Sequence, residues 1–105
     1  GPVAGAGARA AAAACPPGSN GGDDDERTAA LAALAQLGGD QALSALQRVL
    51  ARRDPCSAGL RRKAVFLLSQ QRAPETADAL LRVAQSDPDR EVREQAVFWL
   101  SQVRS

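Results

Sequence analysis

Hydrophobic residues recur every three or four positions from Thr28 to the end of the chain, which is the spacing of one face of an α-helix. Gly, Pro and Asp residues separate these runs and supply the signals with which helices begin and end. The pattern predicts five helices, at about residues 28–37, 40–52, 58–71, 75–86 and 88–104. The fold class expected from this pattern is all-α.

Polar residues at the helix ends indicate how each helix is capped. Gly38-Gly39 is expected to end the first helix, and Asp40 to be the N-cap of the second. Asp87 is expected to cap the fifth helix, with Pro88 at its first position, where the missing N–H costs nothing.

The first 22 residues differ from the rest of the chain, because they consist mainly of Gly, Ala, Pro, Ser and Asn. Such a segment buries too little apolar area to offset the entropy lost on ordering. We therefore expect a flexible low-complexity leader over residues 1–22 and a folded region over residues 23–105.

The folded region contains an internal repeat. A shift of 32 residues places residues 60–70 over residues 92–102 with seven of eleven positions identical. A shift of 34 places Arg27 and Ala30 over Arg61 and Ala64. A unit of 32–34 residues made of two antiparallel helices is typical of an α-solenoid. About two and a half units are expected, at residues 23–53, 54–86 and 87–105, the last one incomplete.

The run at residues 87–100 has the form Asp-Pro-x-x-x-Val-Arg-x-x-Ala-Val-x-x-Leu. It resembles the shorter form of the HEAT repeat family, closest to bacterial HEAT-repeat proteins of unassigned role, and the resemblance covers about residues 24–105. The family resemblance implies a scaffold for protein–protein interaction without enzymatic activity. On fold analogy alone, the function expected is a protein-binding module with no cofactor.

Two Asp/Arg pairs recur with the repeat: Asp54 with Arg61, and Asp87 with Arg93. Each Asp is expected to cap its helix and each Arg to reach a neighbouring turn, which would make a ladder between units. The alternative is a catalytic acid beside an anion clamp. Alanines 30, 64 and 96 share one repeat position, where a small side chain allows two helices to approach closely.

Composition narrows the range of functions. Aromatic residues make up only 3% of the chain, and there is no His, which excludes His-based acid–base catalysis and His metal sites. No metal site is expected. The net charge is +1, so the chain as a whole is not drawn to nucleic acid. No apolar run reaches the length of a transmembrane helix.

The second helices of the units are expected to present a mixed polar surface to a protein partner of unknown identity. The candidate partner-binding residues are Gln47, Arg48, Arg52, Asp78 and Arg82. An alternative is binding of nucleic acid or another polyanion by the Arg-rich segment 48–63. A remote alternative, by analogy with some HEAT-like proteins, is a bilin-lyase-like enzyme that uses the two cysteines.

Cys15 and Cys56 are predicted to be able to form a disulfide, because each precedes the first helix of a unit and stacking brings such turns together. A disulfide would imply an extracytoplasmic location, and free thiols a cytoplasmic one.

The C-terminal helix carries core-type residues at its outer side, among them Val97, Trp99, Leu100 and Val103. We expect this edge either to be covered by further HEAT units or to mediate self-association.

Overall fold

The computed structural model describes Cys15 and residues 26–104, so the expected leader lies outside the described residues except for Cys15. The helices of this region are α2 (Glu26–Leu37), α3 (Gly39–Leu50), α4 (Ala58–Ser69), α5 (Thr76–Ser86) and α6 (Arg90–Arg104). A short 3-10 helix, η1 (Pro55–Ser57), precedes α4. The all-α prediction is confirmed, and each helix lies within two residues of its expected bounds.

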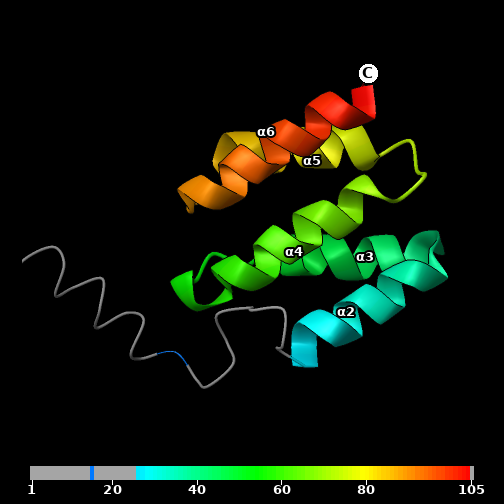
Figure 1. The fold of residues 1–105 in the computed structure, drawn as a ribbon, viewed down its shortest axis with the longest axis horizontal. Helices are drawn as coiled ribbons and strands as arrows, with labels where there is room; N and C mark the ends of the chain where they lie inside the picture. The colour runs from blue at the N-terminus through cyan, green and yellow to red at the C-terminus, as the bar shows by residue number, and fades with distance from the viewer. Residues whose placement is uncertain (1–14, 16–25, 105) are drawn as a thin grey trace, which may run out of the picture.

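The helices form two layers. Figure 1 shows α2, α4 and α6 side by side and running in the same direction, with α3 and α5 behind them. Contacts join α2 to α4 and α4 to α6 within the first layer, and α3 to α4 and α5 to α6 between the layers. Each new pair of helices stacks on the previous one, which is how a short α-solenoid is built. The exact division into units at residues 23–53, 54–86 and 87–105 stays a prediction.

Two expected N-caps are wrong. Asp40 lies in the first turn of α3, and Gly38 is the N-cap, since Gly38 and Gly39 have positive φ angles of 70° and 78° that let the chain reverse direction directly after α2. Asp89, and not Asp87, caps α6: its Oδ2 accepts a hydrogen bond of 3.0 Å from the Val92 N–H. The carboxylate of Asp87 is instead engaged by an arginine from α4.

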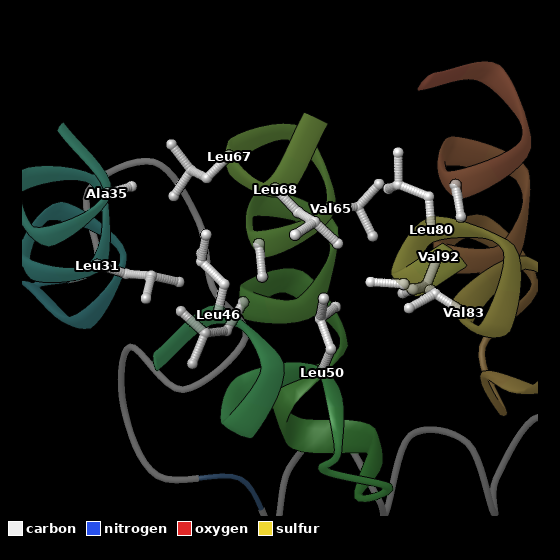
Figure 2. Close-up of a cluster of buried hydrophobic side chains, with 14 of the residues drawn as sticks. Leu31, Ala35, Leu46, Leu50, Val65, Leu67, Leu68, Leu80, Val83 and Val92 are labelled. Atoms are coloured by element: carbon white, nitrogen blue, oxygen red, sulfur yellow. The ribbon is translucent and has the colours of Figure 1, made fainter. Parts of the chain in front are cut away.

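One continuous core runs through all the helices. Figure 2 shows Leu31 of α2, Leu46 of α3, Leu68 of α4, Leu80 of α5 and Val92 of α6 converging on the space between the layers. Because neighbouring pairs share this core, the pairs stabilise one another and each is incomplete alone.

Two of the three alanines at this repeat position are in the core. Ala64 and Ala96 are fully buried. Ala30 is exposed, and Leu31 enters the core in its place. The alignment of α2 with α4 is therefore shifted by one residue from the expected alignment. Thr28, which is buried, occupies the place of Arg61, and Arg27 is exposed.

Candidate functional site

A groove of about 300 Å³ lies between α3 and α5, the two helices of the second layer. Aliphatic, amide, hydroxyl and charged side chains line it together: Gln47, Leu50, Ala51, Arg53, Ala79, Arg82, Val83, Ser86 and Asp87. The two helices belong to consecutive pairs, so the groove forms only because the pairs stack.

The amphipathic pattern of α3 and α5 decides which side chains reach this groove. The apolar faces of both helices point into the core and bury Ala42, Leu43, Leu46 and Leu50 of α3 and Ala79, Leu80 and Val83 of α5. Gln47 and Arg82 follow these faces at helical spacing and line the groove, with Gln47 half-buried and Arg82 exposed.

Arg53 closes one side of the groove. Its Nη1 donates a hydrogen bond of 2.8 Å to the carbonyl oxygen of Ser86, the last residue of α5. A cation is favourable there, because the last carbonyls of a helix have no partner within the helix and carry the negative end of its dipole. The bond ties the segment after α3 to the end of α5.

A buried arginine joins the two helix pairs beneath this groove. The Arg61 side chain has no exposed surface, and its Nε and Nη2 donate to the two carboxylate oxygens of Asp87 at 2.9 and 3.3 Å. Its Nη1 donates to the Asp54 carbonyl at 2.8 Å and to the Ser57 hydroxyl. A buried charge is tolerated only when it is paired and hydrogen-bonded in this way. The ladder between units expected from the repeat is present at this position.

Asp54 stands at the same point of the repeat but in a different environment. Its carboxylate is 41% exposed and accepts hydrogen bonds from Ser57 Oγ at 3.0 Å and Arg52 Nε at 3.3 Å. Desolvation of the Asp54 carboxyl raises its pKa, but the Ser57 hydrogen bond and the charge of Arg52 outweigh this effect and leave the pKa below its ordinary value.

The family model for HEAT repeats matches residues 19–101, which is most of the chain. The chain belongs to the HEAT repeat family. HEAT repeats are generally scaffolds for protein interaction. The chain matches none of the curated proteins and none of the solved structures with which it was compared.

The HEAT fold brings only some of the predicted partner-binding residues together. Gln47 and Arg82 share the groove, whereas Arg48 lines a separate hollow beside Leu34 and Arg52 is paired with Asp54. Asp78 is exposed on α5 and does not line this groove. The groove residue that sequence reasoning missed is Arg53, which the sequence shows only as one member of an Arg-rich segment.

The cations of the Arg-rich segment 48–63 lie in different environments in the HEAT fold. Arg61 is buried against Asp87, and Arg62 lies 3.5 Å from a carboxylate oxygen of Glu91. The Lys63 ammonium lies over the ring of Phe66 at 5.6 Å from its centroid. Arg61 therefore cannot contribute to a basic surface, and polyanion binding by the other cations of this segment stays a prediction.

The predicted cysteine pair is confirmed. Cys15 and Cys56 form a disulfide with a Cα–Cα distance of 5.4 Å, and no free cysteine is present among the described residues. The bond stands directly beside Asp54 and Pro55 and crosses 41 residues of sequence. The thiols that a bilin-lyase-like reaction would need are joined to each other.

Within Cys15 and residues 26–104, no three His, Cys, Asp or Glu side chains are grouped so as to hold a metal ion. In the same region no helix has the length and apolar character to cross a membrane.

Proposed function

We propose that this HEAT-repeat chain is a non-enzymatic scaffold that binds an acidic segment of a partner protein in the groove between α3 and α5. The observation that carries the proposal is the composition of the groove: an aliphatic floor of Leu50, Ala79 and Val83 beside two guanidinium groups, Arg53 and Arg82. A partner segment would gain apolar burial and charged hydrogen bonds in one place.

The charge balance of the groove favours a carboxylate over a cation. Asp87 is the acidic residue of the lining, and the Arg61 guanidinium neutralises it from below. Arg82 is exposed, and its guanidinium makes no hydrogen bond or ion pair with another described residue. Arg53 uses Nη1 for the Ser86 carbonyl, so its remaining N–H groups are available to a ligand.

The remaining predicted residues extend this surface along the second layer. Three of the predicted residues lie outside the groove: Arg48 on α3, Arg52 just after α3, and Asp78 on α5. Charged residues outside a binding groove affect the association rate and selectivity for a partner more than the affinity. The disulfide supports an oxidising, extracytoplasmic compartment for this function.

Affinity capture with the full chain, followed by mapping of the contact, tests the proposal. The bait is the wild-type protein, with Arg82→Glu as the test variant and Arg104→Glu as the matched control on α6. A partner that uses the groove is lost with Arg82→Glu and kept with Arg104→Glu, and it protects amides of α3 and α5 from hydrogen exchange. Equal capture by both variants, or capture that nuclease abolishes, would contradict a protein-binding groove.

A further inference from the structure

The connection between α3 and α4 carries both the disulfide and one side of the groove. Cys56 lies in the 3-10 helix η1 and is bonded to Cys15. Arg53 lies three residues before Cys56 and reaches the end of α5 across the groove. Three residues of chain span at most about 10–11 Å. The disulfide and the groove are therefore anchored on the same short piece of backbone.

Arg53 alone holds the end of α5 only weakly. Its bond to the Ser86 carbonyl is exposed to solvent. A hydrogen bond of this kind shifts an equilibrium by a factor of roughly two to twelve. The bond therefore persists only while the backbone of the connection keeps Arg53 opposite the end of α5.

Two restraints fix that backbone. One is Arg61, which is buried and donates to the Asp54 carbonyl at 2.8 Å and to the Ser57 hydroxyl. The other is the disulfide, which holds Cys56 in a 3-10 helix of three residues, and such a short helix needs support from outside itself. Both cysteines are half-buried, so a reductant in solution can reach the sulfur atoms. Arg61 is closed to solvent, and the disulfide is the restraint that chemistry can remove.

We infer that the Cys15–Cys56 disulfide is a redox-sensitive switch of the groove. Its reduction loosens the connection, releases Arg53 from the end of α5 and weakens binding of an acidic partner segment. The oxidised chain is the binding form. The part of the inference that concerns the partner rests on the proposed function, whereas the coupling of the disulfide to Arg53 rests on the contacts of this connection.

The switching reaction is a thiol–disulfide exchange with a dithiol as the reductant. A thiolate of the dithiol attacks one cysteine sulfur, breaks the disulfide and forms a mixed disulfide, and the second thiol of the reductant then displaces that cysteine. Two electrons pass to the protein. Cys15 and Cys56 end as thiols with one proton each, and the dithiol ends as a disulfide.

The last turn of α5 reports the state of Arg53 without any ligand. The Asp87 amide donates to the Val83 carbonyl at 3.0 Å in this turn, and Ser86 is its last residue. A cation on the Ser86 carbonyl stabilises the turn, since the last carbonyls of a helix have no partner within it. Release of Arg53 should therefore increase opening of the turn and exchange of the Asp87 amide.

Hydrogen exchange of the full chain, before and after dithiothreitol, tests the coupling. Reduction should accelerate exchange of the Asp87 amide roughly fivefold. The Thr76 amide at the other end of α5, which bonds to the Ala73 carbonyl, should not change. In Arg53→Gln the Asp87 amide should exchange fast in both redox states, whereas Arg82→Gln, which removes the other guanidinium of the groove, should keep the response to reductant.

Binding of a fluorescein-labelled peptide that alternates aspartate and leucine tests the partner side. Fluorescence anisotropy should show an affinity roughly tenfold lower for the reduced chain. Arg53→Gln should bind weakly in both redox states, and Arg82→Gln should bind more weakly than the wild type but keep the tenfold ratio. A chain with Cys15→Ser and Cys56→Ser should bind as the reduced wild type does and ignore the reductant.

An Asp87 amide that ignores reduction would overturn the inference, and so would equal acceleration at Asp87 and Thr76 or a loss of helix in circular dichroism. The last two results would mean that the disulfide supports the whole fold and does not act on the groove. Equal peptide affinity in both redox states would also overturn the switch while the proposed function stands. A redox-sensitive Asp87 amide without peptide binding to either form would support the coupling and count against the proposed function.

Discussion

The two Asp-Pro turns of this HEAT-repeat chain have the same sequence start but are held in different ways. The turn at Asp87 is fixed by Arg61, whose guanidinium crosses from the preceding helix to a buried carboxylate. In α2 the place of Arg61 is taken by Thr28, and the Asp54 carboxylate accepts hydrogen bonds from Arg52 and Ser57. Arg61 reaches that turn only at the Asp54 carbonyl and the Ser57 hydroxyl, and the turn also has a disulfide between Cys56 and Cys15. The ion pair with Arg61 is thus confined to the Asp87 turn, and the disulfide to the Asp54 turn.

The largest expected effect comes from removing the arginine. Arg61→Gln leaves Asp87 buried without its counter-ion and also removes the bond to the Asp54 carbonyl. The free energy of unfolding should fall by about 3–5 kcal/mol, measured by urea denaturation. Arg62→Gln on the same helix is the control, since its pair with Glu91 is exposed and worth less than about 1 kcal/mol. Similar losses for both variants would show that the Arg61 clamp adds nothing specific.

Breaking the disulfide should have the next largest effect. Replacing both cysteines by serine opens a loop that spans 41 residues, and the chain-entropy model gives a loss of about 3–4 kcal/mol. Reductant should lower the stability of the wild type by the same amount and leave the double variant unaffected. An unchanged denaturation midpoint on reduction would mean that the bond does not stabilise the fold.

The Asp54 carboxylate should have a smaller effect on the free energy of unfolding, and this effect should depend on pH. The pKa of Asp54 is lowered in the folded chain. The carboxylate therefore adds to the free energy of unfolding above the unfolded-state pKa near 4, and this addition is lost as the pH falls through the lower pKa of the folded state. Asp54→Asn should cost below about 1 kcal/mol at neutral pH, since the side chain is partly exposed. The stability curves of wild type and variant should converge in acid. A difference that persists or grows in acid would contradict the lowered pKa.

The sequence was sufficient for the features that depend on local pattern. Helical spacing and the repeat predicted the helices, their stacking and the family, and the position of the cysteines predicted their pairing. The N-cap predicted for α6 was wrong because Asp87 and Asp89 are equally good caps in sequence, and the Asp87 carboxylate is engaged by Arg61, 26 residues earlier. The predicted alignment of α2 with α4 was wrong because the Ala-rich run of α2 fits several alignments. Arg27 and Ala30 were therefore placed one residue away from the true equivalents of Arg61 and Ala64.

The groove could be predicted only in part for a related reason. Gln47 and Arg82 follow from the amphipathic faces of their helices, which periodicity reveals. Arg53 enters the site through a contact with Ser86, 33 residues away, in a segment without periodicity. Such a contact depends on how consecutive helix pairs stack, and no local pattern records it.

Native-state hydrogen exchange at the two turns, in oxidised and reduced protein, tests most directly whether they are held by different means. The probes are the Ser57 amide, which bonds to the Asp54 carbonyl, and the Asp89 amide, which bonds to the Asp87 carboxylate. Turn amides exchange by local opening, so each reports its own turn rather than global stability. Reduction should accelerate exchange at Ser57 and leave Asp89 unchanged. Equal acceleration at both amides, or none at Ser57, would contradict separate stabilisation of the two turns.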